Sequence, residues 1–301
     1  MTSEFPLVSI GIPVFNEEKT IARALDSLLT QSFRNFEIIV SDNCSTDKTA
    51  EICKIYAKKH DRIKLNLNMK NLGIIANFQI VHRKASGKYF MWAAGDDYRD
   101  PECLKRLVNE LELDPAAGVA FCAVRRENTD GSLKDIIRFD GRNNPNRLSH
   151  WQLASRLLSP RKKIRLLKYN QFIYGLFRYD IIDDILAIED NILTYGDRTF
   201  VALAALACRF RYVDQVLFYK TVKEPFRIRH PDDSYRQPKK ENPYLEYYLH
   251  YYYKLSQYII KFSKIPLRRK FFVLFLPYWM SWRYARKRRK KMRKLFYGEN
   301  A

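Results

Sequence analysis

The chain has 301 residues, of which 47% are hydrophobic, enough to bury the core of one large domain or two modest ones. Its five cysteines are odd in number and contain no Cys-x-x-Cys pair, so a disulfide framework and a structural zinc site are not expected. The formal net charge is +21, and no apolar run approaches the roughly 20 residues that span a bilayer.

The first hundred residues alternate between predicted strands and helices. The apolar runs predict strands at 7–14, 36–40, 63–67 and 88–93. Helical periodicity predicts helices at 20–30, from about 45 to 60, and at 74–85. Such alternation predicts βαβ units with a mostly parallel sheet. In sheets of this kind, ligands bind beyond the carboxyl ends of the strands.

The pattern becomes less regular after residue 100. We expect helices at 101–113, after Tyr179, and at 199–208, and strands at 119–124 and 211–219. Residues 151–167 form a basic amphipathic pattern that Pro160 interrupts. Turn-forming residues are dense at 128–146, which predicts an irregular loop.

Two acidic clusters follow predicted strands, at Asp42 and at Asp96–Asp97. Carboxylate oxygens are the ligands that Mg²⁺ and Mn²⁺ favour. Aspartate is also common in solvated turns, but two clusters at the same edge of a sheet favour a ligand site. The Gly-rich fingerprints of dinucleotide and P-loop sites are absent from the sequence.

Four short motifs stand in order along this half of the chain. They are Ile-Pro-Val-Phe-Asn-Glu at 12–17, Val-Ser-Asp-Asn-Cys-Ser-Thr-Asp at 40–47, Asn-Leu-Gly at 71–73 and Ala-Ala-Gly-Asp-Asp at 93–97. Together they resemble the family 2 nucleotide-sugar glycosyltransferases of prokaryotic cell-surface polysaccharide assembly, over about residues 5–220. The resemblance implies the GT-A fold, a Rossmann-like α/β architecture whose mostly parallel sheet is flanked by helices.

The resemblance also implies a donor site at the carboxyl edge of the sheet. Asp96 is expected to hold a divalent cation, Mg²⁺ or Mn²⁺, with Asp97 in support. The residues expected to bind the donor nucleotide are Pro13, Phe15, Glu17, Asp42, Asn71, Gly73 and Asp96. Phe15 has an alternative role as an ordinary core aromatic.

The chain departs from the family pattern at several of these positions. Asn43 replaces the second acid of its motif, Cys44 replaces a glycine, and Ala94 replaces the first aspartate of the metal motif. Gly196 precedes Asp197 where the family usually has a glutamate.

Asp197 is the expected catalytic base, because an inverting transfer needs a group that takes the proton of the attacking hydroxyl. An aspartate at a helix N-terminus also has a purely structural use, since it faces the positive end of the helix dipole. Asp190 and the pair Asp183–Asp184 are alternatives for the base.

Basic residues after the last predicted strand are candidates for binding the diphosphate. Lys220 is one of them, and the resemblance implies a closing loop that here carries Arg227, Arg229 and His230. A solvated basic loop is the alternative interpretation of this segment.

Residues 221–301 are predicted to form a basic, aromatic-rich helical extension. From residue 241 onward there are 15 Lys/Arg against 3 Asp/Glu, and an aromatic stretch at 271–282 precedes the most basic run. Aromatic and basic side chains together favour an anionic membrane surface. Helices packed on the catalytic domain are the alternative. Nucleic acid is the less favoured partner, because no nucleic-acid fold signature occurs.

These patterns predict a catalytic domain at 1–220 and an extension at 221–301. The expected enzyme is an inverting, hexosyltransferase-like glycosyltransferase that moves a sugar from a nucleotide diphosphate donor, foremost a UDP-sugar, to a hydroxyl of a lipid-linked saccharide. Because residues 1–6 lack a basic signal-peptide region, we expect a cytoplasmic protein, peripheral at the inner membrane face. The alternatives are a non-catalytic nucleotide-sugar-binding or scaffold protein and a nucleic-acid-binding module.

Overall fold

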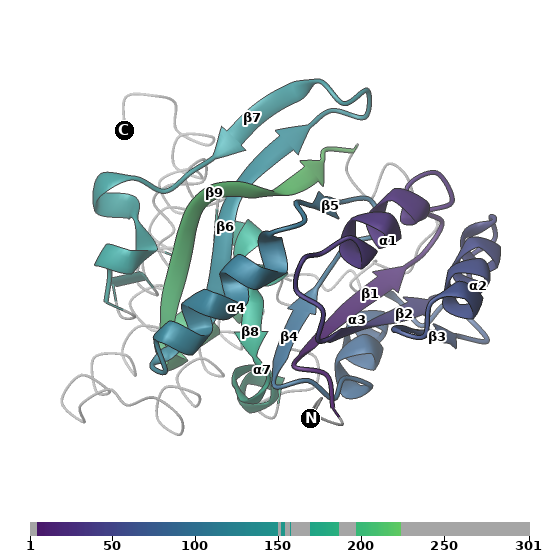
Figure 1. The fold of residues 1–301 in the computed structure, drawn as a ribbon, viewed down its shortest axis with the longest axis horizontal. Helices are drawn as coiled ribbons and strands as arrows, with labels where there is room; N and C mark the ends of the chain where they lie inside the picture. The colour runs from purple at the N-terminus through teal and green to yellow at the C-terminus, as the bar shows by residue number, and fades with distance from the viewer. Residues whose placement is uncertain (1–4, 150–151, 154–156, 158–168, 187–196, 224–301) are drawn as a thin grey trace, which may run out of the picture. The chain divides into compact units, whose positions relative to one another are not determined.

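The computed structural model describes residues 5–149, 152–153, 157, 169–186 and 197–223 (Figure 1). The predicted extension lies outside these ranges apart from residues 221–223, and so does most of the helix predicted at 151–167. Within the described ranges, no helix has the length and apolar character needed to cross a membrane.

The first half of the sheet is built as the alternation predicts. In chain order its elements are β1 (Val8–Val14), α1 (Ile21–Leu29), β2 (Phe36–Asp42), α2 (Thr49–Lys59), β3 (Ile63–Leu67), α3 (Ile74–Arg83) and β4 (Tyr89–Trp92). The strands pair in parallel in the order β3-β2-β1-β4. Their carboxyl ends therefore meet at one edge of the sheet.

Helix α3 packs directly on β1 and β2. This close approach depends on Gly11, since a Cβ added there would come within 2.7 Å of side-chain atoms of Phe90 and Val81. Apart from Ser9, strand β1 is apolar, and Val8, Ile10 and Ile12 have no exposed surface. Continuous apolar strands of this kind are typical of parallel sheets covered on both faces.

The second half of the sheet mixes strand directions. Its elements are β5 (Tyr98–Arg99), α4 (Cys103–Leu113), β6 (Ala117–Glu127), β7 (Leu133–Ile137), three 3₁₀ turns (Gly141–Asn143, Pro145–Arg147, Tyr169–Tyr174), β8 (Leu176–Arg178), α7 (Tyr179–Leu186), α8 (Asp197–Ala207) and β9 (Arg209–Thr221). Strand β8 lies antiparallel between β4 and β6, and β9 runs parallel to β6 and antiparallel to β5. Helix α4 lies over β6 and β9 (Figure 1).

The irregular loop predicted at 128–146 is partly wrong. It contains β7, which pairs antiparallel with β6, followed by two of the 3₁₀ turns. A tight turn joins the two strands, with Gly131 in the left-handed region at φ +82°. Because β7 is mostly exposed, it lacks the apolar alternation by which a strand is found in a sequence.

Arg99 is a buried cation that joins the two halves. Its guanidinium donates to the carbonyl oxygens of Trp92 (3.3 Å) and Tyr174 (2.8 Å). It also lies 4.4 Å from the ring centroid of Phe218. Because Arg99 is 4% exposed, these contacts stand in for its water shell and fix Tyr174 beside the end of β9.

Candidate active site

A cavity of about 340 Å³ opens where β1, β2, β4 and β9 end. This is the edge at which open α/β sheets bind ligands. The residues around it are a mixture of apolar, amide and charged side chains: Pro13, Val14, Phe15, Glu17, Asn43, Ile74, Asn77, Phe78, Ala94, Gly95, Asp96, Arg126, Tyr174, Lys220, Thr221, Val222 and Lys223.

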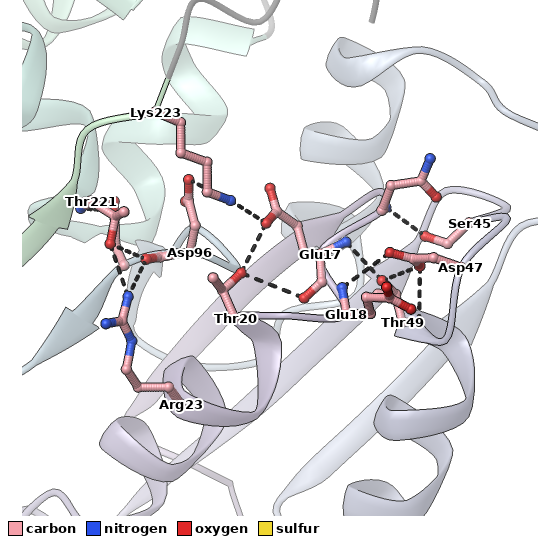
Figure 2. A network of polar contacts seen from close by, with 12 residues as sticks. Glu17, Glu18, Thr20, Arg23, Ser45, Asp47, Thr49, Asp96, Thr221 and Lys223 are labelled. Carbon is pink, nitrogen blue, oxygen red and sulfur yellow. Dashed lines mark hydrogen bonds and ion pairs between the residues drawn. The ribbon is translucent and has the colours of Figure 1, made fainter. Parts of the chain in front are cut away.

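The loop after β1 is held by the turn after β2. The backbone N–H of Glu17 donates to Thr49 Oγ1 at 2.7 Å, and that of Glu18 donates to Asp47 Oδ2 at 3.1 Å. In return, Asn16 accepts from the backbone N–H of Thr46 at 2.9 Å. Figure 2 shows these contacts on one side of Glu17. They fix the place of Phe15 and Glu17 on the cavity wall without using the Glu17 carboxylate.

Asp42 and Asn43 face different surroundings although they are adjacent. The Asp42 side chain is buried and accepts hydrogen bonds from the backbone N–H (3.0 Å) and the hydroxyl of Ser45. Asn43 borders the cavity. Its amide donates to Asn71 Oδ1 at 2.8 Å, and its oxygen accepts from Leu72 N at 2.9 Å. Asn43 is therefore part of the cavity wall, whereas Asp42 is not. The 71–73 turn is hydrogen-bonded to Asn43.

The adjacent side chains of Asp96 and Asp97 also lie in different surroundings. Asp96 borders the cavity, whereas the side chain of Asp97 is 3% exposed and accepts from the backbone N–H of Thr221 at 2.9 Å. Burial raises the pKa of Asp97 to about 7, against the opposing charge of Lys220, whose Nζ lies 3.7 Å from Asp97 Oδ2. Asp97 is thus a link between the 94–97 turn and β9.

Two lysines at the end of β9 bring positive charge to the cavity. Lys223 forms ion pairs with Glu17 and with Asp96, the latter at 3.1 Å (Figure 2). Lys220 lies 4.4 Å from the ring centroid of Tyr174. Burial alone would lower the pKa of Lys220, but Tyr174 and the nearby aspartates raise it. Lys220 therefore carries its charge at neutral pH.

Arg23 of α1 locks the end of β9 against the acidic turn. Its guanidinium donates to the backbone oxygen of Asp96 (3.1 Å) and to Thr221 Oγ1 (2.9 Å). Thr221 Oγ1 itself donates to the same backbone oxygen at 2.7 Å. Figure 2 shows these bonds beside Lys223, which lies two residues beyond Thr221 and pairs with Asp96.

Asp197 begins α8 and is exposed at the helix N-terminus. The surrounding protein nonetheless desolvates its carboxyl and raises the pKa of Asp197, while the charge of Lys220 opposes that shift. The charge of Lys220, a residue of the cavity wall, acts on this carboxyl, although Asp197 is not itself among the residues around the cavity.

Of the other candidates for the base, Asp183 and Asp184 lie in the part of the chain that the structure describes. Asp183 and Asp184 belong to α7, where Asp183 Oδ1 is 3.7 Å from His82 Nε2, and neither borders the cavity. Asp190 and the predicted closing loop with Arg227, Arg229 and His230 lie outside the described residues.

Sequence reasoning missed Lys223 and the contribution of Tyr174. The closing loop was predicted at Arg227, Arg229 and His230, although Lys223, a basic residue two positions after the last strand, gave a usable signal. No motif in the sequence marks Tyr174. Its place at the cavity involves a contact distant in sequence, the hydrogen bond from Arg99 to its backbone oxygen.

The two carboxylates predicted to bind a divalent cation do not fit a metal centre as a pair. Asp97 is turned into the protein, Ala94 offers no ligand, and Asp96 is already paired with Lys223. Across the described ranges, no group of three or more His, Cys, Asp or Glu side chains could hold a metal ion.

The sequence matches the model of a known protein family. The family model described as "Glycosyl transferase family 2" matches residues 9–186, more than half of the chain. The chain belongs to glycosyltransferase family 2. Among curated relatives, the putative glycosyltransferase EpsE of Bacillus subtilis is 39% identical over 108 residues. That match spans 36% of this chain and 39% of EpsE, so it covers less than half of either protein.

Two solved structures share the fold of this chain at low sequence identity. S. aureus TarS 1–349 in complex with UDP-GlcNAc has a TM-score of 0.61 and 19% identity, covering 89% of this chain and 70% of that one. The mannosyltransferase PcManGT from Pyrobaculum calidifontis, in complex with GDP-Man and Mn²⁺, has a TM-score of 0.51 and 17% identity, covering 92% and 70%. The predicted α/β GT-A fold is thereby confirmed.

Proposed function

We propose that the cavity binds a nucleotide-sugar donor and that the protein transfers its sugar, with inversion, to an acceptor hydroxyl. The observation that carries this proposal is the cavity at the carboxyl ends of β1 and β4, in which Asp96, Lys220 and Lys223 stand together. Membership of glycosyltransferase family 2 supports it. So do the UDP-GlcNAc and GDP-Man complexes of the two proteins that share the fold.

The base and ribose of the donor would lie against the loop after β1. Pro13 and Phe15 give this part of the wall an apolar surface, and Asn43 gives it a polar one. We assign Asp42, Asn71 and Gly73 to the layer behind, where they hold Asn43 and the adjoining turn in place. The diphosphate would then reach the lysines, since an ammonium group is a compact charge that suits phosphate oxygens.

The chemical step uses Asp197 as the base. The acceptor oxygen forms a bond to the anomeric carbon, the bond from that carbon to the phosphate oxygen breaks, and the proton of the hydroxyl passes to the carboxylate. The nucleoside diphosphate leaves with the bonding electrons. A raised pKa suits Asp197 to this role, because a base acts best when its pKa lies near the working pH.

We propose a lipid-linked saccharide as acceptor and a site at the inner membrane face. The support is in the sequence, since the segment after residue 241 joins aromatic side chains to an excess of basic ones. Such a segment binds anionic lipid through interfacial aromatics and charge attraction. Flotation of the full chain with anionic vesicles at low salt, compared with a chain lacking residues 266–301, tests this part.

Release of nucleoside diphosphate from a panel of UDP-, GDP- and dTDP-sugars tests the function itself. We expect release from one donor class. Ala94→Phe should abolish it by filling the cavity, whereas Ala116→Phe, the same change in an exposed turn, should not. If none of the donors is cleaved or bound by the wild-type chain, the proposal is wrong.

A further inference from the structure

The cavity proposed to bind the diphosphate is itself lined by negative charge. Two carboxylates, those of Asp96 and Glu17, border the same cavity. A diphosphate placed next to them would be repelled unless a cation stands between the anions. In a site built on oxygen ligands, a divalent cation shared with the phosphates is the usual answer.

This chain lacks some of the side chains that would hold such an ion in the family's metal motif. The side chain of Ala94 has no oxygen, and Oδ1 of Asp97 accepts a hydrogen bond from the backbone N–H of Thr221. What remains at the cavity is the Asp96 carboxylate, with the Lys223 ammonium 3.1 Å away.

Lys223 occupies the place between the two anions. Its ammonium pairs with Glu17 on one side and with Asp96 on the other, as Figure 2 shows. An ammonium has three N–H donors, so these two pairs leave one for a phosphate oxygen. Lys220, near the end of β9, is a second cation on the wall of the cavity.

The position of Lys223 is built by the fold. Thr221 is bonded to Asp96 and Asp97 through its hydroxyl and its backbone N–H, and Arg23 adds a third tie. The side chain of Lys223 is 16% exposed, so its charge acts with little screening by solvent.

We propose that the Lys223 ammonium takes the place of the divalent cation, so that this protein binds its nucleoside diphosphate without metal. The inference rests on the proposed function, because it assumes that the cavity receives a nucleotide-sugar diphosphate. Lys223 bridges Asp96 to the diphosphate, and Lys220 neutralises the charge that grows on the leaving group.

Calorimetric titration of the full chain with UDP and with GDP, each in EDTA and in MnCl₂, tests the proposal. We expect one nucleotide to bind wild type in EDTA with a Kd within about threefold of that in MnCl₂. Lys223→Met should weaken binding in EDTA by about tenfold to a hundredfold, the usual effect of losing a charged hydrogen bond. In that variant MnCl₂ should restore affinity, because the Asp96 carboxylate is released to hold the ion.

Lys54→Met removes the same charge from an exposed position on α2 and should leave both titrations unchanged. Lys223→Arg keeps the charge and should still bind in EDTA, which separates loss of charge from loss of fold. Wild-type binding that occurs in MnCl₂ but not in EDTA would overturn the metal-free proposal while leaving the proposed function intact. Absence of binding by either nucleotide in both buffers would overturn the proposed function as well.

Discussion

Beside the carboxyl ends of β1 and β2, the polar side chains of the site are bound mainly to one another, whereas the end of β9 presents charges to the cavity. Asn43 makes hydrogen bonds to the 71–73 turn, and Asp42 makes two to Ser45. Lys220 and Lys223 instead balance Asp96, Asp97 and Glu17. The first region therefore sets shape, and the second sets charge. Changes in the first should cost stability, and changes in the second should cost activity.

The largest loss of activity should come from Asp197→Asn. This variant tests whether the group that takes the proton is the carboxylate influenced by Lys220 of the charged region. We expect the transfer rate to fall by about 10²–10⁴-fold, because the base is lost. Nucleotide affinity should stay within about threefold, since this group acts on the acceptor. For wild type, the rate should decline as pH falls through the raised pKa of Asp197, because a protonated carboxyl cannot accept the proton.

Initial rates and calorimetry measure the two quantities for Asp197→Asn. Asp183→Asn, on α7 and away from the cavity, is the matched control and should keep the wild-type rate. A loss of less than tenfold in Asp197→Asn would show that another group is the base.

Asn43→Ala tests the shape-setting region. The change removes hydrogen bonds to Asn71, Leu72 and Asn68, and takes from the backbone N–H of Leu72 the acceptor that it has in the wild type. We expect the free energy of unfolding to fall by about 2–3 kcal/mol. Urea denaturation measures it. Asn128→Ala, at the exposed turn before β7, should cost less than about 1 kcal/mol, and equal losses in both variants would break the distinction between the regions.

The smallest effect concerns His82, whose ring is buried on α3 behind the first region. Burial lowers the pKa of His82 to about 4 from its ordinary 6.5. As pH falls through this window, the unfolded chain takes up the proton first, so the free energy of unfolding must fall. From pH 7 to pH 5.5 the loss should be about 1 kcal/mol. His82→Phe should remove that part of the pH dependence, and an unchanged slope in urea titrations would contradict the assignment.

The two regions were also unequally predictable. The elements of the first half follow from apolar runs and polar turns, because βαβ units are fixed by neighbours in sequence. For the same reason, Phe15 and Glu17 of the loop after β1 and Asp96 after β4 come together around one cavity. In the second half, β5 has two residues and β7 is exposed, so neither has a pattern that periodicity could detect.

The site residues that the sequence did not reveal owe their positions to distant contacts. Asp96 and Asp97 are identical side chains in adjacent positions, and their separation depends on where Thr221 lies. Lys223 reaches the cavity because Arg23, about 200 residues earlier in the chain, ties Thr221 to the acidic turn. No local spacing encodes such a contact.

The pairing of β9 has a consequence for the order in which the molecule acquires its site during synthesis. Tyr219 pairs with Tyr98 across a long stretch of chain, and β9 is the last strand of the described part to be made. Contacts of such sequence separation form late, after local units have folded. The β1–β4 half can assemble while the ribosome is still translating, but its ligand edge stays incomplete until residues 209–223 emerge. Under the proposed function, nucleotide binding would therefore require that this last strand has paired.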